Sequence, residues 1–186
     1  MNRIFQLEEK DLIERINSGE KELFRHIINE HSNFVYSICV NILRNPEDAR
    51  DVSQETFYKA YKAIKKYDGT KSKLSTWLYK IAYNKCIDFI RKKNNFLNLK
   101  SYLKQKDSNF DYQKHQFENE IVRDLISELS ESDSALITFY YLNELSIKEI
   151  SYITDDSETN IKVKLHRLRK QLKSIANKKY NNELQK

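Results

Sequence analysis

The sequence predicts an all-α protein, with two small helical domains joined by a flexible linker. The chain has only two Gly and one Pro in 186 residues, whereas an all-β protein needs turn residues about every 8 to 12 positions. Apolar residues recur at three- and four-residue steps, which is the helical period. A stretch rich in Asn, Lys, Gln and Ser interrupts this pattern once. We therefore expect domains over 1–93 and 119–186, with the linker over 94–118.

Four helices are expected in the first domain. Asn45 and Pro46 form a strong helix start, because an Asn side chain caps the first turn and Pro fits its first position. The expected elements are a short helix ending at Ser18-Gly19, a helix over 20–44 that is either continuous or bent near His31, a helix from Pro46 to Lys66, a loop over 67–73, and a helix from Ser75 to Lys93.

Four shorter helices are expected in the second domain. Ser132 and Asp133 are expected to cap the second of them, and Ser157 to cap the last. The expected elements are a helix starting at Phe117, a helix over 134–142, a short helix over 146–153, and a longer one from Ser157 to Ala176.

Charge is distributed in alternating blocks along the chain. Residues 1–58 hold 7 basic and 11 acidic side chains, whereas 59–93 hold 11 and 2. Residues 119–161 hold 2 basic and 10 acidic side chains, whereas 162–186 hold 9 and 1. Two basic blocks are what two separate surfaces facing polyanions would need. Lys-rich helices that are merely well solvated would give the same composition. Composition alone therefore does not separate polyanion-binding surfaces from solvated helices.

The last two expected helices have the layout of a helix-turn-helix. The second would bury Ile161, Leu165 and Leu168, and its opposite side is polar and basic, as a helix in the major groove of duplex DNA would be. The alternative is an ordinary solvated amphipathic helix. The candidate DNA-binding residues are Thr159, Asn160, Lys162, Val163, Lys164, His166, Arg167 and Lys170.

A second candidate surface lies on the helix from Ser75 and the loop before it. Aromatic rings among cations suit single-stranded DNA, because rings stack on unpaired bases while lysines follow the backbone. The alternative for Trp77 is a place in the core. The candidate residues are Lys66, Tyr67, Lys71, Lys73, Trp77, Lys80, Asn84 and Arg91.

The sequence contains no recognisable catalytic set, and we expect no enzyme activity, no cofactor and no metal. The four His residues lie in separate contexts without a carboxylate at ligand spacing. Cys39 and Cys86 each lie in an apolar helical context, so buried free thiols are favoured over a disulfide or a metal site. We also expect no membrane insertion and a cytoplasmic location, because the chain has neither a signal-peptide core nor an apolar run of spanning length.

Three stretches of the chain resemble bacterial extracytoplasmic-function (ECF, group 4) sigma factors of RNA polymerase. Residues 48–61, DARDVSQETFYKAY, and 75–84, STWLYKIAYN, resemble the second conserved domain of that family. Residues 145–169, which include Lys164-Leu165-His166-Arg167, resemble the fourth. Both motif sets occur in the family's order and spacing.

The resemblance implies a role for each candidate surface. The surface that docks on the clamp helices of core RNA polymerase would comprise Asp48, Asp51, Gln54 and Glu55. The loop over 67–73 and the helix after it would melt the minus-ten element, and the helix from Ser157 would read the minus-thirty-five element. Partners would be core RNA polymerase and promoter DNA, both duplex and melted. Family members are commonly held inactive by an anti-sigma factor, which would be a further partner.

The chain departs from the family pattern at two places. Thr154 and Asp155 stand where an apolar residue and Gly are usual before the recognition helix, and Asp156 stands where an apolar residue is common. An unpaired carboxylate does not sit in a core, so we expect an exposed or re-routed turn, with the start of the recognition helix left open. Tyr83 stands where the family often has Arg.

Two rival functions stay open at the level of sequence. A transcription regulator other than a sigma factor could use the same helix-turn-helix with an N-terminal helical module for a ligand or partner. It would bind duplex DNA without polymerase, whereas a sigma factor of this type would bind its promoter well only as holoenzyme. A small helical enzyme is the second rival, and the missing catalytic set argues against it.

Overall fold

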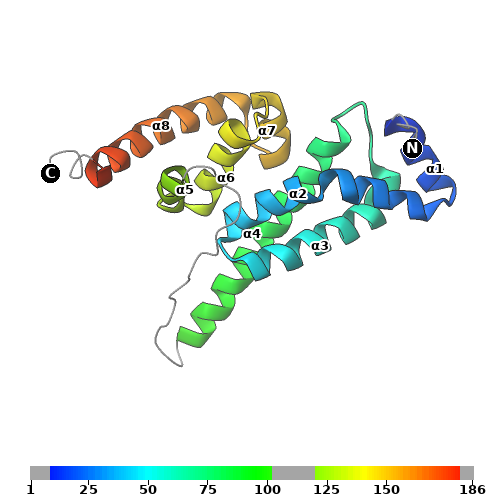
Figure 1. Cartoon of the computed structure of the whole chain (residues 1–186), viewed down its shortest axis with the longest axis horizontal. Helices are drawn as coiled ribbons and strands as arrows, with labels where there is room; N and C mark the ends of the chain where they lie inside the picture. The colour runs from blue at the N-terminus through cyan, green and yellow to red at the C-terminus, as the bar shows by residue number, and fades with distance from the viewer. Residues whose placement is uncertain (1–8, 102–119, 181–186) are drawn as a thin grey trace.

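The computed structural model describes residues 9–101 and 120–180, and every regular element in these ranges is helical (Figure 1). This confirms the all-α prediction for the described residues. The helices are α1 (Glu9–Ser18), α2 (Phe24–Leu43), α3 (Pro46–Ala63), α4 (Leu74–Ser101), α5 (Glu120–Ser127), α6 (Glu131–Ile137), α7 (Ile147–Thr154) and α8 (Glu158–Tyr180). We call α1–α4 the N-terminal bundle and α5–α8 the C-terminal bundle.

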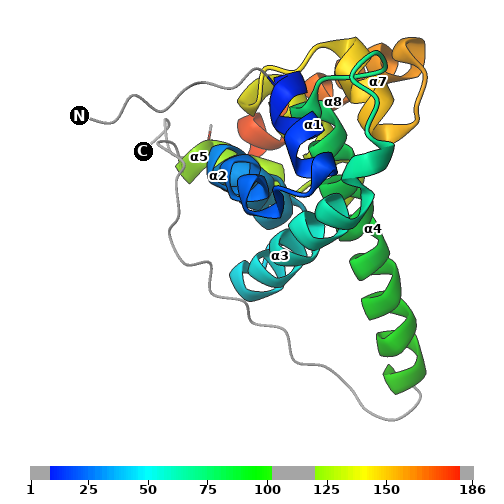
Figure 2. The same ribbon diagram turned by 90° about the vertical axis from the view of Figure 1, so that its right-hand side faces the viewer.

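Helices α2, α3 and α4 pack on one another around an apolar core, and α1 lies across one end (Figure 2). The core side chains recur at helical steps, as Val35, Ile38 and Ile42 do on α2. Asn45 caps α3 as expected, because its side chain accepts hydrogen bonds from the amides of Glu47 and Asp48.

Several helix ends differ from the predicted ones. α2 is continuous at His31. Helix α3 gives way at Ile64–Lys66 to one 3-10 turn, and α4 begins one residue early, at Leu74. The largest difference is at the end of α4, which continues to Ser101 instead of ending at Lys93 (Figure 2). Residues 94–101 contain no Gly or Pro to stop a helix, and their polar composition was misleading. The rest of the expected linker lies outside the described residues.

Helices α6, α7 and α8 of the C-terminal bundle each begin with a serine cap. Ser130, rather than the expected Ser132, caps α6 by accepting a hydrogen bond from the amide of Asp133. Ser146 and Glu149 form a reciprocal capping box at the start of α7. Ser157 accepts a hydrogen bond from the amide of Asn160 and so caps α8, as expected. Helix α6 continues directly into a π-helical turn over Thr138–Leu142, so the predicted helix over 134–142 is helical throughout.

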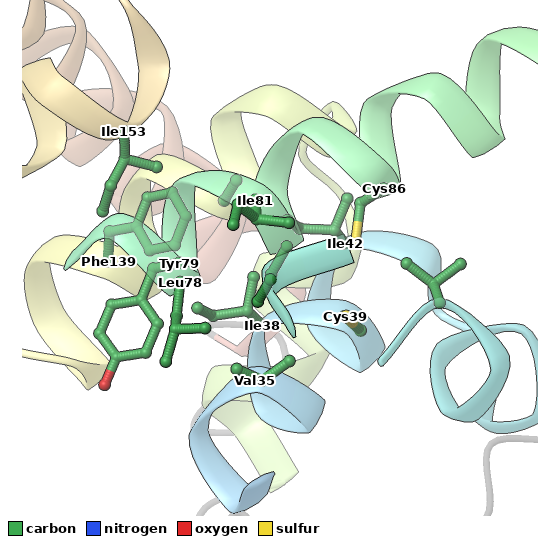
Figure 3. Packing of buried hydrophobic residues seen from close by; sticks show 14 of the residues in the cluster. Val35, Ile38, Cys39, Ile42, Leu78, Tyr79, Ile81, Cys86, Phe139 and Ile153 are labelled. Carbon is green, nitrogen blue, oxygen red and sulfur yellow. The ribbon is translucent and has the colours of Figure 1, made fainter. Parts of the chain in front are cut away.

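The two bundles share a continuous apolar core. Phe139 and Ile153 of the C-terminal bundle lie beside Tyr79 and Ile81 of α4, and all four side chains are buried (Figure 3). The guanidinium of Arg44, the left-handed residue that ends α2, donates to the carbonyls of Ile126 and Leu129. The chain thus adopts a closed arrangement, in which α7 packs against α4 and α6 against α2.

Both cysteines are buried and free, as the sequence predicted (Figure 3). Interaction with the Cys39 thiol, together with burial, raises the pKa of Cys86 and disfavours a reactive thiolate. Among the described residues, no group of His, Cys, Asp and Glu is placed to hold a metal ion. In the same ranges no helix combines the length and the apolar character needed to cross a bilayer.

Candidate nucleic-acid and polymerase interfaces

The face of α8 predicted to read duplex DNA is open to solvent. Ile161, Leu165 and Leu168 are buried against the rest of the C-terminal bundle. Helical spacing therefore turns the opposite side outward. Seven of the eight predicted residues are exposed: Thr159, Asn160, Lys162, Val163, His166, Arg167 and Lys170. The exposed fraction of Val163 is 62%, which is unusual for an aliphatic side chain and fits apolar contact with a thymine methyl group.

The unusual turn before α8 preserves the start of that helix. Asp155 has φ 56°, so it adopts the left-handed conformation that Gly takes most readily, and Asp is among the residues that tolerate it. Asp156 accepts hydrogen bonds from Asn160 and Lys164, which lower its pKa below the ordinary value. Lys164 is therefore half-buried and paired with Asp156 in this arrangement.

The face of α4 predicted to bind melted DNA is partly covered by the C-terminal bundle. Lys80 is ion-paired with Asp155 and lies over the ring of Tyr152 at 4.7 Å from its centroid. Lys73 lies 3.4 Å from the carboxylate of Glu149, which also accepts a hydrogen bond from Thr76 of α4. Two lysines that we expected to contact DNA phosphates are thus paired with carboxylates on α7 and at its end.

The loop before α4 is held to the N-terminal helix. The Tyr67 hydroxyl donates to Glu9 and contacts the Ser72 carbonyl oxygen, and burial together with Glu9 raises its pKa. Its ring lies 5.4 Å from that of Trp77, which is half-buried against the core. Trp77 therefore fits both the core alternative and a stacking role. The other predicted residues spread out: Lys66, Lys71 and Arg91 are exposed, and Asn84 is half-buried.

The predicted polymerase-docking residues share the outer side of α3. Asp51 and Gln54 are exposed. Glu55 is ion-paired with Lys85 at 2.7 Å, and this contact lowers the pKa of the Glu55 carboxyl. Asp48 lies 2.8 Å from Lys93. The pairs leave Asp51 and Gln54 as the more accessible half of the predicted surface.

Tyr58, which the sequence-based prediction missed, lies one turn beyond this surface. Its exposed fraction is 65%, and Lys62 lies over its ring at 5.3 Å from the centroid. Residues 51, 54, 55 and 58 follow the spacing of one helix face, which was the available signal. Exposed aromatic rings are enriched at protein-docking surfaces.

The residues that depart from the family pattern gather where the two bundles meet. The ring of Tyr83 lies 5.9 Å from that of Phe139, and burial raises the pKa of the Tyr83 hydroxyl. Asp155 holds Lys80, as described above. A cavity of about 100 Å³ at this junction is lined by Tyr83, Ser132, Asp133, Leu136, Thr154, Asp156, Ile161 and Lys164. Tyr83 and Asp155 thus contribute directly to the contact between the two bundles.

Comparisons with known families match both bundles. Residues 27–96 match the family Sigma-70 region 2, and residues 119–172 match the family Sigma-70, region 4. The ECF RNA polymerase sigma factor SigM of Bacillus subtilis is 34% identical over 160 residues, which cover 84% of this chain and 97% of that protein. SigW of the same organism is 30% identical over 183 residues, with coverages of 89% and 97%.

Two solved structures have a similar fold. The sigma factor RpoE of Bartonella quintana, in complex with the anti-sigma factor NepR, gives a TM-score of 0.69 at 17% identity and covers 83% of this chain and 96% of that one. CnrH, in complex with the cytosolic domain of CnrY, gives 0.67 at 19% identity, with coverages of 90% and 96%.

Proposed function

The chain belongs to the extracytoplasmic-function sigma factors, which direct promoter-specific initiation of transcription by RNA polymerase, and from this premise we propose how its residues divide that task. Sigma factors are DNA-binding regulators of transcription, and we assign no catalytic residue. The observation that carries the proposal is the match of both bundles, in order, to regions 2 and 4. We propose that the protein acts in the cytoplasm, where RNA polymerase is found.

The exposed face of α8 is proposed to read the minus-thirty-five element. Arg167 and Asn160 carry the side chains best suited to base edges, because guanidinium and amide groups make bidentate hydrogen bonds in the major groove. Lys162 and Lys170 would bind phosphates and fix the position of the helix without reading sequence. Release of Lys164 from Asp156 would add one more cation.

The face of α4 and the loop before it are proposed to hold the melted minus-ten element. Lys66 and Lys71 are exposed at the loop and would follow the backbone of the unpaired strand. Trp77 and Tyr67 supply rings on which extruded bases can stack, and stacking offsets part of the cost of unpairing. Lys73 and Lys80 would join this surface after losing their carboxylate partners on the C-terminal bundle.

Both sites cannot work at once in the closed arrangement, so we infer that the bundles separate on polymerase. Elements at minus ten and minus thirty-five are about 25 base pairs apart, or about 85 Å at about 3.4 Å per base pair. In the closed arrangement α7, which precedes the recognition helix, packs directly on α4. Core RNA polymerase would supply the free energy for opening by binding each bundle at its own place.

The outer side of α3 is proposed to dock on core RNA polymerase, with Asp51 and Gln54 at its centre and Glu55, Asp48 and Tyr58 around them. An anti-sigma factor is proposed as a further partner, because the similar sigma factor RpoE is bound to the anti-sigma factor NepR. Such a regulator would act by keeping core RNA polymerase and promoter DNA from the proposed surfaces of the two bundles.

Binding to core RNA polymerase tests the proposal. We expect the chain to form a stable holoenzyme, and the double variant Asp51→Lys/Glu55→Lys to bind core polymerase at least tenfold more weakly. The matched control is Glu14→Lys/Glu22→Lys, which makes the same charge change on exposed residues before α2. A chain that binds promoter duplex tightly alone and ignores core polymerase would instead be the rival transcription regulator.

A further inference from the structure

Helix α8 is longer than reading one major groove requires. The match to region 4 ends at residue 172, whereas α8 runs to Tyr180. At about 1.5 Å per residue, a helix of 23 residues is about 35 Å long. The major groove of B-DNA is only about 12 Å wide. The groove also winds around the duplex, so a straight helix of this length leaves it at one end and passes over its phosphate wall.

The exposed face continues without a break along this extension. Successive steps of three and four residues place one line of side chains along the helix. The line comprises Thr159, Val163, His166, Lys170, Lys173 and Asn177, all of which are exposed. The first members belong to the proposed recognition surface, and the last two lie beyond the matched region. Figure 1 shows this end of α8 reaching past the body of the C-terminal bundle.

Neighbouring lysines at this end have opposite environments. Within the described ranges, Lys173 and Lys178 make no ion pair and, with Lys170, Ser174 and Asn177, line a shallow hollow of about 400 Å³. Lys179 instead faces α5, at 2.7 Å from Asp124 and 3.2 Å from Glu128. These carboxylates raise the pKa of Lys179. One cation therefore anchors the helix, and the others stay available to a polyanion.

We propose that Lys173, Asn177 and Lys178 form a clamp on the phosphate backbone of duplex DNA beside the minus-thirty-five element. The clamp rests on the proposed function of α8 and extends its contact with DNA. Ammonium and amide groups are common phosphate ligands and carry no sequence information directly. In homeodomains, likewise, the C-terminal end of the recognition helix contacts the backbone. The clamp would add affinity that depends on salt and is independent of base sequence.

The salt dependence of holoenzyme binding tests the clamp. The probes are a fluorescent duplex carrying a promoter mapped from transcript 5′ ends and a second duplex with its minus-thirty-five element scrambled. Binding is measured over a range of KCl concentrations at a temperature too low for melting. Each lost phosphate contact should reduce the slope of log K against log salt by about 0.9. We expect this reduction for Lys173→Gln and for Lys178→Gln, on both duplexes.

Lys179→Gln is the matched control, because it removes the same charge from the same helix and should leave the slope unchanged. Slopes for Lys173→Gln and Lys178→Gln equal to the control's would overturn the clamp. A reduced slope on the promoter duplex alone would overturn the clamp too, because it would mean that these residues contact bases and not only phosphates. If the unsubstituted holoenzyme failed to form, the proposed function itself would fail, which is a distinguishable result.

Discussion

Removing the ion pairs that close the two bundles should strengthen binding of single-stranded DNA by the free protein. The perturbation is the double variant Asp155→Asn/Glu149→Gln. Asn tolerates the left-handed backbone of residue 155, and Gln keeps the capping box with Ser146. The local structure of the C-terminal bundle is therefore preserved, while Lys80 and Lys73 of the N-terminal bundle lose their partners.

The size of the effect follows from the exposure of these pairs. Asp155 is 71% exposed and Glu149 24% exposed. Partly exposed ion pairs contribute about 0.2 to 1 kcal/mol each, so two of them stabilise closure by about 0.4 to 2 kcal/mol. Apparent affinity for a ligand of the open form scales with the open fraction. While the closed form predominates, the variant should bind about 2- to 30-fold more tightly, at about tenfold per 1.4 kcal/mol.

Trp77 provides the assay, because it is the chain's single Trp and lies on the proposed surface. Its fluorescence is followed while a single-stranded oligonucleotide is added. The control variant Glu14→Gln/Glu20→Gln also removes two negative charges, from ion pairs of α1 and the turn after it. Equal affinities for the variant and this control would refute the reasoning, since only overall charge would then matter.

Three further predictions concern the stability of the fold. Arg44→Asn keeps a residue suited to φ 56° but loses the bond to the Leu129 carbonyl, and should lower the urea-derived unfolding free energy by about 1.5 to 3 kcal/mol. Ser157→Ala removes the cap of α8 and should cost about 1 kcal/mol in the same measurement. Burial opposes ionisation of Glu149, but hydrogen bonds from Ser146 and contact with Lys73 outweigh it and hold its pKa below 4.5. The contribution of the Glu149 carboxylate to the free energy of unfolding is thus complete above pH 4.5 and disappears as the pH falls through the lowered pKa. A urea midpoint that falls with acid as much in Glu149→Gln as in the unsubstituted protein would contradict this.

The sequence predicted the helical core and the capped helix starts well, because both depend on local signals. Asn45 before Pro46 and Ser157 before α8 specify their turns through bonds to residues two or three positions away. The end of α4 was missed, because residues 94–101 carry neither a stop signal nor a clear apolar period. Composition alone does not separate a polar helix from a linker.

The solvent-exposed face of α8 was predictable, whereas the pairing of cations on the α4 face was not. Burial of Ile161, Leu165 and Leu168 determines which side of α8 faces solvent, and that pattern is visible in the sequence. The pairing of Lys80 with Asp155 joins residues 75 positions apart, and no local period encodes it. The unusual residues Thr154, Asp155 and Asp156 were the sequence signal that the turn had a special role.

Run-off transcription tests the central claim most directly. Purified chain, core RNA polymerase and a template library of genomic promoter fragments are combined, and transcript 5′ ends are mapped. The account predicts discrete starts that require the chain, share upstream sequence words at two positions, and are lost with Asp51→Lys/Glu55→Lys. Starts that are unchanged when the chain is omitted, or duplex binding by the chain without any polymerase-dependent initiation, would contradict it.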